Sequence, residues 1–299
     1  MQNEVVKFVH DPCIIREKNL YYVYSTGHGI PIRRSRDLKT WENLGRVFVE
    51  DIPEWTKTEI PGSVFPWAPD IAYLNGLYHL YYSVSTFGKN RSAIGLATNK
   101  TLDPASKDYA WKDQGKVFES FPSDNYNAID SNVLALKNRL VFLFGSFWSG
   151  IKMVEADRKT GRPIAGAPVV SLARRPSPGA VEAPFLIEYR DWFYLFVSFD
   201  FCCRGARSTY NLRVGRSKDV AGPYLDREGV SMLDGGGTVV LQGAGRMAGP
   251  GHCAVLTVVK QTFLAHHYYD VEENGVPKLQ VRRLNWDREG WPSVGEPLT

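Results

Sequence analysis

Short apolar segments bounded by glycine, proline, asparagine or aspartate recur along the whole chain, and helical periodicity is scarce. The same order occurs five times: an opening phrase leads into an apolar strand, a turn follows, and an aromatic-rich strand ends in a small or polar residue. The opening phrases are HDPCII from His10, WAPDIAYL from Trp67, NAIDSNVL from Asn127, VEAPFLIEY from Val181 and GPGHCAVL from Gly249. A repeat of roughly fifty to seventy residues made of short strands predicts a radial array of sheets.

The predicted fold is therefore all-β, a single-domain five-bladed β-propeller over residues 1–299. Approximate blades are 10–66, 67–126, 127–180, 181–248 and 249–299. The second strands of the five repeats end at Ser25, Ser83, Ser146, Ser198 and His267. The last blade needs a further strand to close the ring, and the N-terminal MQNEVVKFV is the candidate, because closure removes exposed strand edges.

Composition and charge narrow the range of partners. The chain is 43% hydrophobic, which is enough for a core, and its net charge of +4 comes without a dense basic cluster. We therefore expect no nucleic-acid partner. No apolar run approaches the length of a transmembrane helix, so no membrane partner is expected. The N-terminus lacks the apolar centre of a signal peptide, which leaves a soluble protein in the cytoplasm, or one secreted with a leader absent from this chain.

The four cysteines stand at 13, 202, 203 and 253 and do not form a disulfide framework for a chain of this length. Adjacent residues of a strand point to opposite faces. Cys202 and Cys203 are therefore expected to point apart, and a bond between them would be strained. No metal-type CxxC spacing occurs.

The opening phrases supply three candidate carboxylates at the start of an apolar strand, where a charge has no packing value: Asp11, Asp130 and Glu182. The first strand of each blade lines the central axis of a propeller, so these groups are expected to share one cavity. Two carboxylates flanking a sugar bond are the tools of glycoside hydrolysis. Glutamate has the longer reach and the higher reference pKa, so Glu182 is the predicted general acid. Asp11 is then the base, and Asp130 raises the pKa of the acid and orients it.

The ordered phrases STGHGI, YYSVSTFGKN, FGSFWSGI, FVSFDFCCRG, GGGT and GPGHCAV, together with HDP and EAPF, run over essentially the whole chain. In this set the chain resembles the endo-α-1,5-L-arabinanases of glycoside hydrolase family 43, which are five-bladed propellers. The resemblance implies the same three roles for the carboxylates and inversion at the anomeric carbon. The chain departs from the family pattern at NAIDSN, where relatives typically have proline after the aspartate and this chain has Ser131.

The resemblance also implies a metal, commonly calcium, at His252 in GPGHCAV, with water as most of its other ligands. A single imidazole suits a hard cation poorly, so a weakly held ion is expected. Trp67, Phe87 and Trp148 are candidates for stacking on arabinofuranose rings, with packing between blades as the alternative. His28 is a candidate for the same face.

The predicted partner is arabinan, a side chain of pectin, or its arabino-oligosaccharides. An open cleft would allow cutting of internal bonds, and a loop blocking one end would make the enzyme exo-acting. A second hypothesis is that the protein is an α-L-arabinofuranosidase or β-xylosidase of the same fold. A non-catalytic propeller that only binds sugar or a protein is a third, and it predicts that the carboxylates are dispensable.

Overall fold

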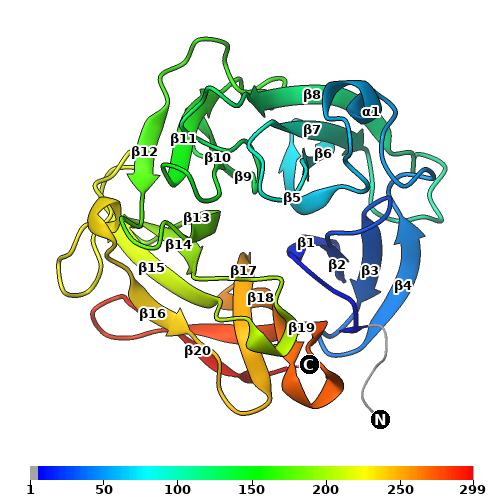
Figure 1. Ribbon diagram of the computed structural model, residues 1–299. Coiled ribbons are helices and arrows are strands. Elements are labelled where there is room, and N and C mark those ends of the chain that lie inside the picture. The colour runs from blue at the N-terminus through cyan, green and yellow to red at the C-terminus, as the bar shows by residue number, and fades with distance from the viewer. Residues whose placement is uncertain (1–5, 299) are drawn as a thin grey trace.

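The computed structural model describes residues 6–298 and has five four-stranded antiparallel sheets in this range, arranged around a central axis (Figure 1). The first sheet is β1 (Cys13–Glu17), β2 (Leu20–Tyr24), β3 (Pro31–Ser35) and β4 (Trp41–Arg46). The second is β5 (Trp67–Leu74), β6 (Leu77–Val84), β7 (Ser92–Asn99) and β8 (Lys112–Ser120). The third is β9 (Asn132–Ala135), β10 (Leu140–Phe144), β11 (Ile151–Ala156) and β12 (Val170–Ala173).

The fourth sheet is β13 (Val181–Tyr189), β14 (Trp192–Phe199), β15 (Asn211–Ser217) and β16 (Thr238–Leu241). The fifth is β17 (Met247–Val258), β18 (Gln261–Asp270), β19 (Val276–Trp286) and β20 (Pro292–Pro297). Helical structure in the described residues comprises α1 (Trp55–Glu59) and the 3-10 turns η2 (Gly205–Arg207), η3 (Met232–Asp234) and η4 (Val271–Glu273), and Val6 also has a 3-10 conformation. None of these helices is long and apolar enough to span a membrane. The predicted five-bladed propeller is confirmed.

The first strand of each sheet lies at the axis. These inner strands contact one another in cyclic order, and β1 contacts both β5 and β17, so the ring is closed. The fifth sheet consists of the four strands β17 to β20, so the expectation that the N-terminal segment supplies one of its strands is wrong. Within the described part of that segment, Lys7 forms a single bridge with Lys278 of β19, and the Val9 amide donates to the Pro277 carbonyl at 3.3 Å. Residues 1–5 lie outside the described range.

One residue near the start of each inner strand has a left-handed backbone. These residues are Asp11 (φ 48°), Ala68 (42°), Asp130 (57°), Ala183 (55°) and His252 (50°). Such a conformation costs a residue other than glycine about 1–3 kcal/mol, so the surroundings must hold it. The position recurs in every repeat, and it alters the direction of the chain where the inner strand approaches the axis.

The polar end of the second strand stabilises this position in the next blade. The amide of Asp130 donates to the Ser83 hydroxyl at 2.9 Å, and that of His252 donates to the Ser198 hydroxyl at 2.9 Å. At the ring closure, the Asp11 amide donates to Nδ1 of His267 at 3.0 Å. In these three repeats, the residue that ends the aromatic strand therefore ties one blade to the next at the axis, whereas the Ala68 amide donates to Thr26 and the Ala183 amide to Asp130.

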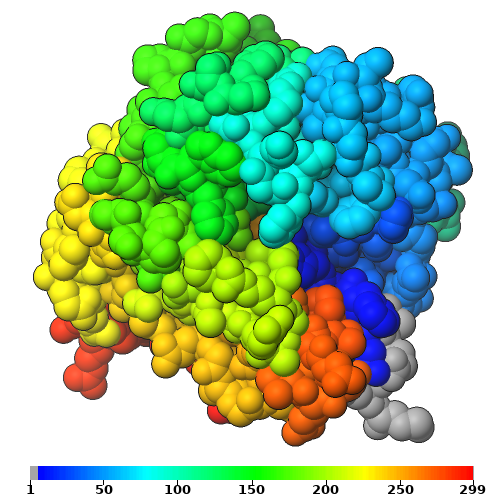
Figure 2. Space-filling model, viewed as in Figure 1, coloured from blue at the N-terminus to red at the C-terminus, as the bar shows by residue number. Residues whose placement is uncertain are grey.

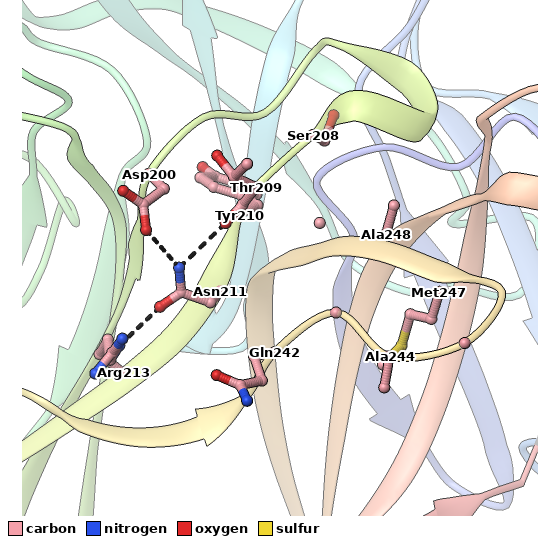
Figure 3. A pocket seen from close by; sticks show the side chains of 13 residues that line it. Asp200, Ser208, Thr209, Tyr210, Asn211, Arg213, Gln242, Ala244, Met247 and Ala248 are labelled. Carbon is pink, nitrogen blue, oxygen red and sulfur yellow. Dashed lines mark hydrogen bonds between the residues drawn. The ribbon is translucent and has the colours of Figure 1, made fainter.

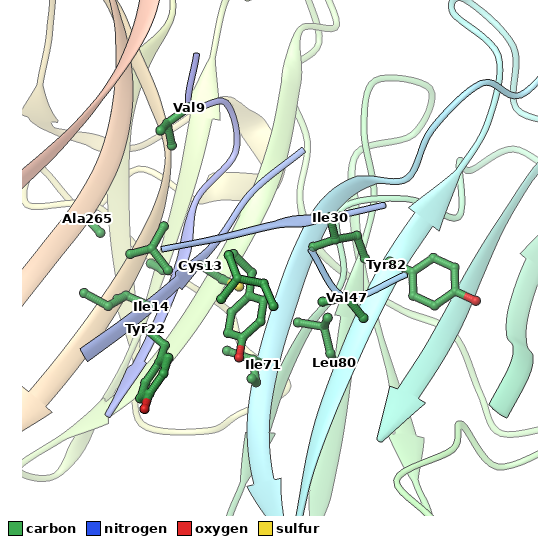
Figure 4. Close-up of a cluster of buried hydrophobic side chains, with 14 of the residues drawn as sticks. Val9, Cys13, Ile14, Tyr22, Ile30, Val47, Ile71, Leu80, Tyr82 and Ala265 are labelled. Atoms are coloured by element: carbon green, nitrogen blue, oxygen red, sulfur yellow. The ribbon is translucent and has the colours of Figure 1, made fainter. Parts of the chain in front are cut away.

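The hydrophobic core lies between neighbouring blades. One buried cluster joins the first, second and fifth sheets, and Figure 4 shows Ile14, Ile71 and Ala265 from these three sheets close together. Three further clusters join the second and third, the third and fourth, and the fourth and fifth sheets. Packing of this kind keeps the inner strands in fixed relative positions, which is what a site shared by several blades requires.

Candidate active site

A cavity of about 1140 Å³ opens at the axis, and residues from all five repeats line it. The lining includes the three predicted carboxylates, Asp11, Asp130 and Glu182, together with His252. In Figure 2, segments from the N-terminal, second, third and fourth blades crowd around the centre of this face. The structure therefore brings together residues that lie far apart in the sequence. Each carboxylate residue is less than a tenth exposed.

The Asp11 carboxylate is held in place by three side chains. The Thr26 hydroxyl donates to Oδ2 at 2.6 Å, and Nδ1 of His10 lies 2.8 Å from the same oxygen. Nδ1 of His252 lies 3.3 Å from Oδ1. Burial opposes the charged form, but His10, His252 and His267 outweigh it and hold the pKa of Asp11 well below its usual range. Asp11 is therefore ionised, as a general base must be.

Glu182 occupies a different environment. The Tyr210 hydroxyl donates to Oε1 at 2.5 Å, and the Ser146 hydroxyl donates to Oε2 at 2.5 Å. Burial raises the pKa of Glu182, and the charge of Asp11 adds to this, although the two hydroxyl donors oppose it. A carboxyl group with a raised pKa retains a proton at higher pH and is suited to act as an acid.

Asp130 lies beside this acid. Its Oδ2 accepts a hydrogen bond of 3.2 Å from the backbone amide of Ala183, the residue that follows Glu182. Burial first, and then the charges of Glu182 and Asp11, raise the pKa of Asp130 well above its usual range. Two buried carboxylates that repel each other titrate as a pair, and each makes it harder for the other to ionise.

His252 faces the cavity, and its amide is fixed by Ser198. Within residues 6–298, no hydrogen bond to Nε2 of His252 is found. Burial lowers the pKa of His252, which keeps the imidazole neutral and able to bind a cation. The donor set fits a hard ion only in part, since it offers one imidazole beside the oxygens of Asp11.

The predicted aromatic residues divide into two groups. Trp67, Phe87 and Trp148 all line the cavity, and Phe87 is 82% exposed. An exposed ring at the rim of a cavity is free to contact a ligand. His28 is not brought into the cavity. Its ring packs on Phe65 with centroids 4.9 Å apart, and Nδ1 lies 3.4 Å from an Asp51 oxygen.

Several residues of the site were not predicted from the sequence. The carboxylates are held by the hydroxyl groups of Thr26, Ser146 and Tyr210. For Ser146 the sequence contained a signal, because this residue ends the second strand of its repeat, as a serine also does in other repeats. Asp70, a further buried carboxylate, accepts hydrogen bonds from Val133 and Asn132 of β9 and lies outside the cavity lining. It ties two blades together.

Cys202 and Cys203 also line the cavity, and their geometry contradicts the expectation that they point apart. Their Sγ atoms lie 2.7 Å from each other. The two residues follow β14 in a loop, and Cys203 has φ 62°, so the alternation of an extended strand does not apply to them.

A second hollow of about 560 Å³ lies between the fourth and fifth blades (Figure 3). Three of its polar side chains form a chain of hydrogen bonds, in which Asn211 donates to Asp200 at 2.8 Å and accepts from Arg213 at 2.7 Å. None of the three predicted carboxylates lines it. The central cavity is therefore the candidate active site.

A closed propeller with one carboxyl group whose pKa is lowered and two whose pKa is raised, all around a large axial cavity, is equipped as a glycoside hydrolase. Comparison with known proteins agrees with this class. The family model for glycosyl hydrolases family 43 matches residues 2–292. The chain belongs to this family.

Individual relatives are similar over most of the chain. The sequence is 43% identical over 301 residues to the extracellular exo-α-(1→5)-L-arabinofuranosidase ArbA of Cellvibrio japonicus, covering 96% of this chain and 86% of that protein. It is also 43% identical over 293 residues to the extracellular endo-α-(1→5)-L-arabinanase 1 of Bacillus subtilis, covering 96% and 88%. The structure of a Cellvibrio cellulosa α-L-arabinanase complexed with arabinohexaose aligns with a TM-score of 0.92 at 42% identity, covering 96% of this chain and 95% of that one.

Proposed function

We propose that this protein hydrolyses internal α-1,5-L-arabinofuranosidic bonds of arabinan, a side chain of pectin, with inversion of the anomeric carbon. The observation that carries the proposal is the placement of the ionised Asp11 and of Glu182, whose pKa is raised, in one large cavity. One of the two relatives is exo-acting and the other is endo-acting, and both are named for cleaving α-1,5-linked L-arabinose chains. This supports arabinan as the substrate class. Both names also include the word extracellular, and we extend this location to the present chain.

In the proposed reaction, Glu182 donates its proton to the glycosidic oxygen as the bond to the anomeric carbon breaks. Asp11 accepts a proton from a water molecule, and the oxygen of that water forms the new bond from the opposite face of the sugar. Thr26 and His10 keep the Asp11 carboxylate oriented toward the water. The cycle leaves Asp11 protonated and Glu182 ionised, and exchange with solvent restores both.

Asp130 supports the acid rather than touching the leaving oxygen in this scheme. Its contact with the Ala183 amide fixes the backbone next to Glu182, and the two neighbouring carboxyl groups disfavour each other's ionisation. The rings of Trp67, Phe87 and Trp148 provide flat apolar surfaces along the cavity, where arabinofuranose units would stack. The cavity exceeds the roughly 300–1000 Å³ of a pocket for one small ligand, which favours a chain of several sugar units.

The products of debranched linear arabinan distinguish endo from exo action. Internal cutting releases a spread of arabino-oligosaccharides from the earliest time points. A single short product from the outset would instead establish exo action, the alternative that the similarity to the Cellvibrio exo-acting enzyme supports. NMR of the first-formed reducing ends tests inversion, because a product that retains the anomeric configuration contradicts the assignment of Asp11 as base.

Glu182→Gln tests the catalytic assignment itself. The amide cannot donate the required proton, so kcat should fall by about 10²–10⁴-fold, the usual contribution of a general acid. Glu188→Gln is the matched control, since Glu188 is an exposed residue of the same strand and should leave the rate unchanged. Undiminished hydrolysis by Glu182→Gln would favour a binding-only propeller. High activity on aryl arabinosides or xylosides with little on arabinan would favour the furanosidase or xylosidase reading.

We also propose that His252 contributes the protein ligand of a calcium ion at the axis. A bound cation would supply positive charge that favours ionisation of nearby carboxylates. The support is the neutral imidazole facing the cavity beside Asp11. Elemental analysis after equilibrium dialysis against calcium should find about one ion per chain in the wild type and a lower content in His252→Ala. Equal calcium content in the two proteins would contradict this assignment.

A further inference from the structure

Cys202 and Cys203 are part of the cavity wall but have no role in the proposed hydrolysis. They lie between β14 and the 3-10 turn η2, in the loop that borders the cavity near His10 and Tyr269. Cys203 is exposed and Cys202 is half-buried, so small molecules in the cavity can reach the pair. The other two cysteines, Cys13 and Cys253, are buried in strands at 3% exposure.

The loop holds the two sulfur atoms in contact. Their distance of 2.7 Å is shorter than two non-bonded sulfur atoms normally approach. The Cys203 amide donates to the Tyr269 hydroxyl at 2.8 Å, and the next amide, that of Arg204, donates to Ser208 at 3.0 Å. The backbone that brings the thiols together is therefore already fixed, and joining them requires little further ordering.

The two thiols differ in their tendency to ionise. Nε2 of His10 lies 3.9 Å from the Cys203 sulfur. Burial opposes the charge on His10, but Asp11 and Cys203 outweigh it and raise its pKa to about 10. A hydrogen bond from Cys202, together with the positive charge of His10, lowers the pKa of Cys203 to about 5, whereas the same hydrogen bond raises the pKa of Cys202. Cys203 is then a thiolate nucleophile with a thiol beside it.

The buried cysteines provide an internal comparison. Burial raises the pKa of Cys13 well above its usual value and that of Cys253 to about 12. Both thiols are inaccessible and remain protonated at neutral pH, so we expect neither of them to react with a disulfide reagent. Any rapid thiol oxidation of the folded protein is therefore confined to the adjacent pair.

We propose that Cys202 and Cys203 form a reversible dithiol–disulfide site in the wall of the catalytic cavity, oxidised by small disulfides of the glutathione type. The Cys203 thiolate attacks one sulfur of the reagent, forming a mixed disulfide and releasing one thiolate. Cys202, after losing its proton to solvent, attacks the Cys203 sulfur and releases the second. Two protein thiols and one small disulfide thus become one protein disulfide and two small thiols. A bond between adjacent cysteines is strained and is therefore easily reduced again.

Intact-protein mass spectrometry of the folded protein tests the site. After incubation with glutathione disulfide alone, the wild type should lose the mass of two hydrogen atoms, and a peptide containing both cysteines should carry the change. Dithiothreitol should restore the original mass. An unchanged mass would overturn the proposal, and so would a glutathione adduct that persists on the wild type.

Two variants separate the roles of the thiols. Cys202→Ser removes the resolving thiol and should trap one glutathione on Cys203. Cys203→Ser removes the nucleophile and should neither add glutathione rapidly nor lose hydrogen. Trapping by both variants at equal rates would contradict the assignment of Cys203 as the nucleophile. These readouts do not depend on hydrolysis, so failure of the proposed function would leave the test intact.

Discussion

Tyr210 determines how firmly Glu182 holds its proton. Its hydroxyl donates to Oε1 at 2.5 Å, and a donor of this kind stabilises the ionised carboxylate and so lowers its pKa. Tyr210→Phe removes the donor and keeps the ring. Because hydrolysis requires protonated Glu182, the alkaline limb of kcat/KM should move to higher pH by roughly one unit.

The pH profile of arabinan hydrolysis measures this shift. Tyr224→Phe is the control, since Tyr224 is a buried tyrosine of the same blade whose hydroxyl donates to the Val220 carbonyl away from the cavity. A profile for Tyr210→Phe that overlays the wild type would show that this tyrosine does not set the pKa of the acid.

Asp130→Asn should have the opposite effect. The amide removes the carboxyl group that competes with Glu182 for ionisation and keeps an oxygen to accept from the Ala183 amide. The alkaline limb should therefore move to lower pH, by roughly one unit. Opposite shifts in Tyr210→Phe and Asp130→Asn would identify Glu182 as the group that titrates. A shift to higher pH in Asp130→Asn would contradict its role in raising the pKa of the acid.

At the scale of the elements, the polar end of the second strand stabilises a strained residue of the next inner strand in three of the five repeats. Ser198 at the axial end of β14 accepts from the His252 amide at 2.9 Å and is fully buried. Ser198→Ala leaves that amide without its partner, which should lower the free energy of unfolding by about 1–3 kcal/mol.

Urea denaturation with a chelator present tests this prediction without interference from bound metal. Ser123→Ala is the control, because Ser123 is an exposed loop residue whose replacement should change stability by at most about 0.5 kcal/mol. Equal stability of the two variants would mean that the inner strand keeps its path without the serine.

The same elements show what the sequence can and cannot reveal. The repeated opening phrases identify the inner strands, so Asp11, Asp130 and Glu182 could be placed in one cavity. Asp70, in the opening phrase of the second blade, shows that a carboxylate there can also be structural. Thr26 could not be assigned to the cavity, because only the folded chain brings its hydroxyl to Asp11. The convergence of Cys202 and Cys203 depends on a left-handed residue in a loop, which strand alternation does not predict.

At the scale of the whole molecule, a group of charges in the last blade, with Asp270 and Lys278 buried at its centre, lies next to the N-terminal segment. Nζ of Lys278, a fully buried residue of β19, lies 2.7 Å from Oδ2 of Asp270 at the end of β18 and 2.5 Å from Glu273. Arg246 also pairs with Asp270 at 2.5 Å, and Lys7 pairs with Glu273 at 2.8 Å. The first described residues of the chain are thereby tied to its last blade.

Asp270→Asn should destabilise the propeller by about 2–3 kcal/mol, because it removes one of the two carboxylates that pair with the buried ammonium of Lys278. The exposed pair of Arg34 and Glu42 is the control, and Glu42→Gln should cost no more than about 1 kcal/mol.

Burial opposes ionisation of Asp270, but Arg246 and Lys278 outweigh it and lower its pKa to about 2. Since an unfolded aspartate titrates near pH 3.9, the stabilisation is complete above about pH 4 and is lost as the pH falls toward 2. In urea denaturation, the difference between wild type and Asp270→Asn should therefore narrow across that window, and a difference independent of pH would show that the carboxylate charge does not stabilise the last blade.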